Sequence, residues 1–155
     1  MKKIIHLIVL LFLLAACEDV FNPPPKAFLN AKLRYTDNDK DKMIDDIEVS
    51  VIGLGMEDPW IDQDTTRTIL IPLNDTPATD YIFILNGEKD TVRIIAGSKL
   101  IYESMETGFY PEFKIQHILY TTRRIDFIEV KDSAVTKEWN ENIIVHINTD
   151  IIINE

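Results

Sequence analysis

The sequence predicts an all-β protein, an antiparallel β-sandwich of the immunoglobulin-like or a similar type. Apolar and polar residues alternate along most of the chain, which is the period-two spacing of half-buried strands. Turn residues separate the alternating segments at short intervals, as expected for many short strands. Helical periodicity is nearly absent, and only 133–140 is a candidate for a short helical turn. A β-barrel is the alternative architecture.

Residues 1–16 have the features of a lipoprotein signal peptide. A basic start precedes an almost wholly apolar run, and the run ends at Ala15-Ala16 and the single cysteine, Cys17. The apolar run is too short to span a bilayer, which takes roughly 20 apolar residues. We therefore expect Cys17 to carry a covalent lipid and to become the mature N-terminus, with the membrane as a partner through this anchor. An ordinary secretory signal is the alternative.

The remaining chain divides into a tether and one domain. Residues 17–26 form an acidic, proline-rich tether in which Pro23-Pro24-Pro25 favours an extended polyproline conformation. Residues 27–155 have the length of a single domain, the expected sandwich. Because no cysteine follows Cys17, this domain must be held by its core without disulfides.

Eight or nine strands are expected in the domain. Leu29, Ala31 and Leu33 show the alternation most clearly, and Pro72 places its strand at a sheet edge because proline cannot donate to a ladder. Asn86-Gly87 between two apolar segments is the strongest hairpin signal. The expected strands are 29–35, 47–51, 68–73, 81–85, 91–96, 100–103, 113–120, 124–130 and 143–148.

Composition restricts the classes of partner. Apolar residues make up 46% of the chain, which excludes global disorder. The net charge of −10 argues against nucleic acid, which is bound through basic patches. It also argues against electrostatic adhesion to anionic lipids.

An acidic segment is the main candidate for a metal site. Asp37, Asp39, Asp41, Asp45 and Glu48 fall at ligand positions of an EF-hand-type calcium loop. The turn position that normally holds glycine is a lysine, however, and the flanking residues are expected in strands rather than helices. A solvated hairpin loop whose charges discourage edge pairing is the favoured alternative, so Ca²⁺ remains only a possible ligand and no other cofactor is expected.

A few aromatic and histidine residues are further candidates. Trp60 follows a proline in an expected loop, where it serves either as a lid on the core edge or as an exposed contact for a ligand or partner. The core lid is favoured. His117 and His146 alternate with apolar residues in strands and are expected to line a sheet or its surface, because a zinc site needs more ligands than the chain offers.

No motif of a known catalytic class is present. The chain has no nucleophile elbow, no phosphate-binding glycine loop and no metalloprotease motif. We therefore expect a protein that is not an enzyme: a lipid-anchored module of the cell envelope, facing the periplasm or the outside, that binds a partner or supports an envelope protein. A calcium or small-ligand binding lipoprotein using 37–48 is the alternative, and a hydrolase is a third hypothesis that would need a clustered carboxylate or Ser-His pair.

Six stretches of the chain carry a family resemblance: 51–55, 71–74, 90–92, 118–122, 125–130 and 141–145. In these stretches the chain resembles a family of small lipoproteins of Bacteroidetes bacteria that is grouped as a domain of unknown function. The resemblance implies an envelope location and an all-β fold, and it implies no activity. Members of such a family often have a cysteine at the place of Thr107 and another soon after the lipidated one, so the disulfide that the resemblance would imply is absent here.

Overall fold

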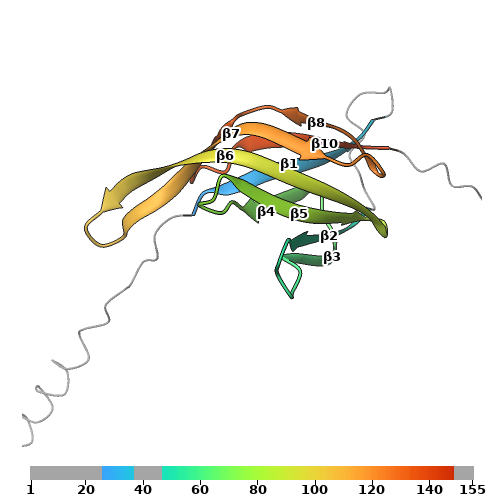
Figure 1. The fold of residues 1–155 in the computed structure, drawn as a ribbon, viewed down its shortest axis with the longest axis horizontal. Coiled ribbons are helices and arrows are strands. Elements are labelled where there is room, and N and C mark those ends of the chain that lie inside the picture. The colour runs from blue at the N-terminus through green and yellow to red at the C-terminus, as the bar shows by residue number, and fades with distance from the viewer. Residues whose placement is uncertain (1–25, 37–46, 149–155) are drawn as a thin grey trace, which may run out of the picture.

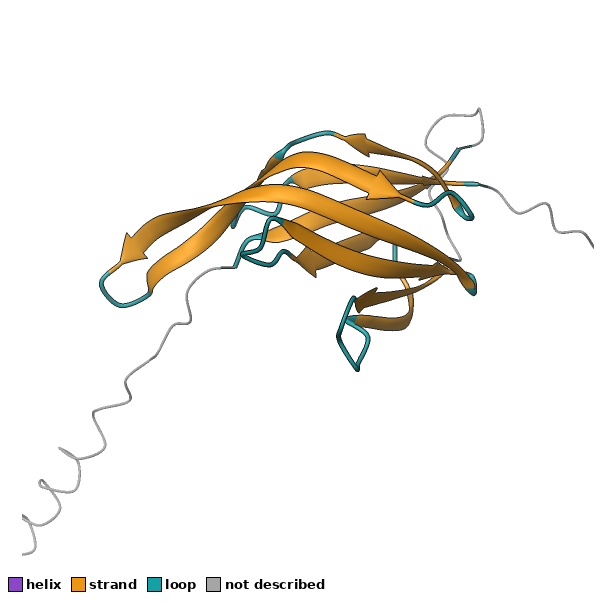
Figure 2. Cartoon of the chain, viewed as in Figure 1, coloured by secondary structure: helices purple, strands orange, loops and turns teal. Residues whose placement is uncertain are grey.

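The computed structural model describes residues 26–36 and 47–148, and this part of the chain is an all-β sandwich (Figures 1 and 2). The predicted fold class is confirmed. The four-stranded sheet has the order β4 (Thr68–Pro72), β1 (Phe28–Tyr35), β10 (Glu141–Ile147) and β8 (Ile125–Val130). The six-stranded sheet has the order β3 (Ile61–Thr65), β2 (Glu48–Gly53), β5 (Ala78–Leu85), β6 (Glu88–Ser104), β7 (Gly108–Tyr120) and β9 (Ala134–Val135).

The ten strands of the described residues differ from the expected set in three places. The separate strands expected at 91–96 and 100–103 are one continuous strand, β6, since the small and polar residues between them stay extended. Strand β3 has no counterpart in the expected set because it is almost wholly polar and pairs through its backbone at an edge. The segment 133–140, a candidate for a short turn, begins with Ala134 and Val135 paired with β7 and then forms a turn at 137–138, where the Trp139 N–H donates to the Thr136 carbonyl oxygen at 3.4 Å.

The strand termini follow the local sequence signals. Strand β4, which ends at Pro72, lies at the edge of its sheet as predicted. Asn86 and Gly87 form the turn between β5 and β6 with φ angles of 49° and 83°, the left-handed conformation that a two-residue hairpin requires. One pairing departs from the expected antiparallel arrangement: β1 runs parallel to β10, the final strand of the described chain.

The core lies between the two sheets. Alternate residues of β1, such as Leu29 and Ala31, are fully buried and belong to the same core as residues of the second sheet such as Val51 and Phe83. Tyr81 of β5 spans the interior, and its hydroxyl donates a hydrogen bond to the carbonyl oxygen of Pro72 in β4. Burial raises the pKa of Tyr81 to about 12, so this hydroxyl remains a donor well above neutral pH.

A buried carboxylate joins the sheets at one end. Asp90 of β6 is fully buried and accepts hydrogen bonds from the Thr121 hydroxyl at 2.6 Å and from the backbone N–H groups of Arg123, Arg124 and Ile125 at 2.8, 2.7 and 2.9 Å. These donors form the connection from β7 in one sheet to β8 in the other. Burial by itself raises the pKa of Asp90, but the four hydrogen bonds outweigh it and leave that pKa below its usual value.

A buried amide joins the sheets at the other end. The side-chain oxygen of Asn142 in β10 accepts from the backbone N–H of Asn30 at 3.0 Å. Its amide nitrogen donates to the carbonyl oxygens of Asp132 at 3.1 Å and of Ala134, in β9, at 2.7 Å. One side chain therefore connects β1, β10 and β9 where the β1–β10 register shifts.

The β6–β7 hairpin extends past the rest of the molecule (Figure 1). The part of it that we call the arm comprises residues 98–113. In Figure 1 the arm projects from the end of the sandwich at which β1 begins.

Within the described residues, no helix has the length and apolar character needed to cross a bilayer.

We expect Asp90→Asn to lower the free energy of unfolding by about 3 kcal/mol, because an amide cannot accept from four donors that are then left buried. Since the folded pKa of Asp90 lies below the usual 3.8, its contribution is complete above that pH and is lost as pH falls through the folded value. Denaturant titrations between pH 7 and 3 should therefore show that acidification lowers the free energy of unfolding less in the variant than in the unsubstituted protein. Asp80→Asn, at an exposed ion pair, serves as the control and should cost much less; equal losses in both variants would contradict the role of Asp90.

Candidate functional site

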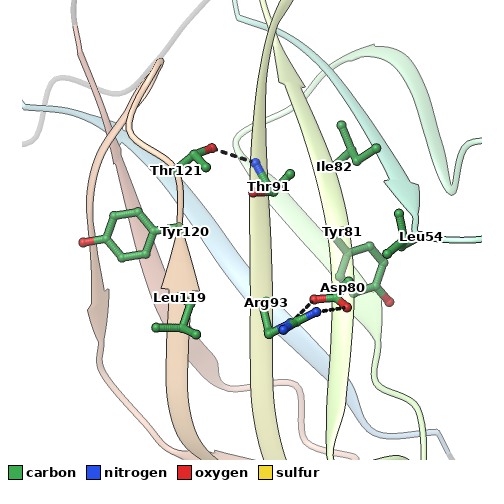
Figure 3. Close-up of a pocket in the computed structure, with 9 residues that line it drawn as sticks. All are labelled: Leu54, Asp80, Tyr81, Ile82, Thr91, Arg93, Leu119, Tyr120 and Thr121. Carbon is green, nitrogen blue, oxygen red and sulfur yellow. Dashed lines mark hydrogen bonds and ion pairs between the residues drawn. The ribbon is translucent and has the colours of Figure 1, made fainter.

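An open groove lies on the outer face of the six-stranded sheet (Figure 3). Its volume is about 370 Å³, within the range of small-ligand sites. Residues from the turn after β2 and from β5, β6 and the end of β7 line it. The lining residues are Leu54, Asp80, Tyr81, Ile82, Thr91, Arg93, Leu119, Tyr120 and Thr121.

An ion pair crosses the middle of the groove (Figure 3). The Arg93 guanidinium donates two hydrogen bonds to the Asp80 carboxylate, at 2.6 and 2.9 Å. The hydrogen bond from Arg93 lowers the pKa of Asp80, and the same bond raises the pKa of Arg93. Both groups are therefore charged at neutral pH and neutralise each other, so neither is available as an acid or a base.

Apolar side chains and a fixed polar margin complete the groove. Leu54 and Leu119 are 67% and 49% exposed, with Ile82 on the same outer face. At one end the Thr121 hydroxyl accepts from the Thr91 backbone N–H at 2.9 Å while it donates to buried Asp90. The hydrogen bonds to Asp90 that join the two sheets therefore also hold this margin in place, so the groove is preformed.

The position of the ion pair follows from the hairpin turn. Asn86-Gly87 fixes a two-residue loop, so Leu85 pairs with Glu88 and, further along the strands, Asp80 pairs with Arg93. Opposite charges at directly paired positions are favourable neighbours. Counting outward from the turn could have found this pair from the sequence, whereas Leu54 and Leu119 reach the groove only through the sheet order.

The domain matches a known family of sequences. A sequence profile for DUF6452, described as a family of unknown function, matches residues 48–147. The chain belongs to the DUF6452 family. The DUF6452 match runs from β2 to β10 and includes the whole groove, but it omits β1, which lies between β4 and β10. No curated protein and no solved structure matches the chain.

Trp60 lies at the boundary between the two sheets of the DUF6452 protein. Its indole N–H donates to the carbonyl oxygen of Leu70 at 2.7 Å, so it covers a backbone acceptor of edge strand β4. Its ring lies 6.0 Å from that of Phe28, which also contacts Trp139 at 5.7 Å. Trp60 is 43% exposed, so this position closes an edge and still leaves part of the ring open to a partner.

The candidate metal ligands are mostly outside the described part of the chain. Four of them lie outside the described residues, as does Cys17: Asp37, Asp39, Asp41 and Asp45. Glu48 is described: it is the exposed first residue of β2 and is paired with Thr65 of β3. Residues 26–36 and 47–148 contain no group of three or more His, Cys, Asp or Glu side chains that could hold a metal ion.

The two histidines of the domain lie on strands, as expected. His117 is an exposed residue of β7. His146 of β10 stacks on Phe127, with 3.9 Å between ring centroids, and its Nε2 is 3.7 Å from a carboxylate oxygen of Glu129. Neither histidine lines the groove.

We expect Trp60→Phe to lower the free energy of unfolding by about 1 kcal/mol, because the ring contact remains and the hydrogen bond to the edge strand is lost. Thermal or denaturant unfolding measures the change. Leu54→Ala, an exposed substitution in the same β2–β3 connection, is the control and should leave stability nearly unchanged. If Trp60→Phe changed the free energy of unfolding as little as the control does, the role of Trp60 in closing the edge of β4 would be wrong.

Proposed function

We propose that this protein is a lipoprotein of the cell envelope whose sandwich is a non-catalytic binding or structural accessory module. The sequence up to Cys17 supports the anchor, since a basic start, an apolar run and small residues precede the single cysteine. Membership in the Bacteroidetes lipoproteins, and placement on the outer membrane facing the periplasm or the exterior, are part of this proposal.

The groove is the observation that carries the binding role. It is preformed and has the volume of a ligand site, and among its lining residues the charged side chains, Asp80 and Arg93, neutralise each other. Exposed Leu54 and Leu119 supply apolar contact area, and the two hydrogen bonds of the ion pair fix the floor between them. Such a surface favours recognition of a partly apolar ligand or of a side chain from an envelope protein.

The anchor is tested by Cys17→Ser. We expect the unsubstituted protein in the membrane fraction with a mass increased by covalent lipid, because several acyl chains, at about 0.8 kcal/mol per buried methylene, make release negligible. The variant should lose that mass and leave the membrane fraction. Thr76→Ser, in an exposed turn of the domain, is the matched control and should remain membrane-bound. An unlipidated parent protein would contradict the proposal.

The binding role is tested by a photoreactive amino acid at Leu119. Irradiation of intact producing cells should yield an adduct of defined mass, because this side chain is half exposed at the groove. The same photoreactive residue at Lys32, on the other sheet, is the control. An adduct specific to position 119 supports the groove, and its mass distinguishes a small ligand from a protein. Identical patterns at both positions would contradict a groove-specific partner.

A further inference from the structure

The arm has one apolar face that the sandwich does not cover. Leu100, Tyr102 and Phe109 are 64%, 55% and 61% exposed. Tyr102 pairs directly with Phe109, and their rings meet edge to face at 5.3 Å. Leu100 pairs with Pro111 one step nearer the sandwich. Because directly paired residues of an antiparallel ladder share a face, these four side chains form one surface.

This surface continues the core-facing side of the six-stranded sheet. The next pair inward is Ser98 with Phe113, and Phe113 is buried in the core. Figure 1 shows β6 and β7 continuing past the end of the four-stranded sheet. The arm therefore carries core-type residues outward, and Leu100, Tyr102 and Phe109 remain more than half exposed there.

The opposite face of the arm carries its charged side chains and is contacted by the β9–β10 connection. Lys137, from the β9–β10 connection, is paired with the Glu103 carboxylate at 2.8 and 2.9 Å and lies 5.8 Å from the centre of the Tyr110 ring. Lys99 pairs with Glu112 in the ladder on this side. The charged side chains of this face thus surround Ile101 and the buried Tyr110, which pair in the ladder, whereas the exposed apolar side chains of the arm lie on the first face.

The tip is an ordered turn with an apolar apex. The Ser104 hydroxyl accepts from the backbone N–H groups of Glu106 at 3.2 Å and Thr107 at 3.1 Å, and Gly108 has a φ of 74°. Met105 is 90% exposed at the apex. Methionine at this position is a flexible apolar contact, which suits a soft and irregular surface.

The chain leaves the sandwich at the foot of the same apolar face. Lys26 and Ala27 line a cavity of about 340 Å³ together with Phe109, Pro111 and Phe113 and their neighbours. The Trp139 indole N–H donates to the Lys26 carbonyl oxygen at 2.8 Å. Only nine peptide steps separate Lys26 from Cys17, so an extended tether reaches at most about 30 Å.

We propose that the apolar face and tip of the arm rest in the headgroup region of the membrane that holds the lipid on Cys17, which fixes the orientation of the sandwich. This inference rests on the proposed lipid anchor. The arm extends roughly 20 Å past the core at strand rise, from the end of the sandwich at which the tether joins, so the tip falls within reach of the bilayer. Tyrosine, phenylalanine, leucine and methionine side chains suit that apolar–polar boundary.

The charges of the arm indicate which lipids are needed. Residues 98–113 carry one lysine and three glutamates, so attraction to an anionic surface is not the driving force. The contact should form on zwitterionic phosphatidylcholine through apolar burial alone. A docked protein partner, or a second copy of this chain, is the outcome that would replace this inference.

The test uses the full lipidated protein in phosphatidylcholine vesicles that contain nitroxide-labelled acyl chains. Met105→Cys gives a single free thiol, since the sulfur of Cys17, the one cysteine of the sequence, carries the lipid in the lipidated protein. This thiol receives an environment-sensitive fluorophore. Lys89→Cys, at the far end of the same strand β6, is the matched control. We expect loss of most of the fluorescence at position 105 and little loss at position 89.

A third protein adds Leu100→Gln and Phe109→Gln to Met105→Cys. Both side chains are exposed, so the melting temperature should not change, and the quenching at position 105 should disappear. Vesicle flotation separates the proposed lipid anchor from the proposed membrane contact of the arm. A protein that does not float with the vesicles overturns both proposals. A protein that floats without quenching at 105, with equal quenching at 89, or with quenching that survives the two glutamines overturns the arm contact alone.

Discussion

Polar side chains that are buried within an otherwise apolar core fix the two sheets relative to each other. Asp90 gathers four donors from the connection that carries the chain from one sheet to the other. Asn142 has the corresponding role at the opposite end, where β1, β9 and β10 meet. Apolar contacts such as those of Phe83 supply most of the driving force, but they are non-directional. The hydrogen bonds are directional, and each donor or acceptor left unpaired in the core would be costly.

The groove and the arm both depend on this arrangement. The Thr121 hydroxyl bonds both to buried Asp90 and to the Thr91 backbone at the margin of the groove. The shape of the outer surface is therefore fixed by a carboxylate on the inner side of the sheet. The arm begins where β6 and β7 extend beyond the four-stranded sheet, near the Asn142 tie and the Trp139 contact to Lys26. Rigid ends allow a long hairpin to project at a defined angle instead of moving freely.

The distribution of charge separates the two surfaces. In the groove, Asp80 and Arg93 form a neutral pair between apolar side chains, which suits recognition of a compact ligand or side chain. On the arm, Lys137 and Glu103 brace one face and leave the other without charge. The net charge of the whole chain is −10, and residues 98–113 share in it with one lysine and three glutamates.

The sequence by itself determined the fold class, the edge position of β4 and the Asn86-Gly87 turn, because alternation and turn chemistry act over a few residues. The register counted from that turn would also have given the Asp80–Arg93 pair. Only the tertiary structure decided the parallel pairing of β1 with β10, the ties at Asp90 and Asn142, and the exposure of Leu100 and Phe109. These depend on contacts between residues far apart in the chain, and an apolar residue on an extended strand shows the same local pattern whether another sheet covers it or not.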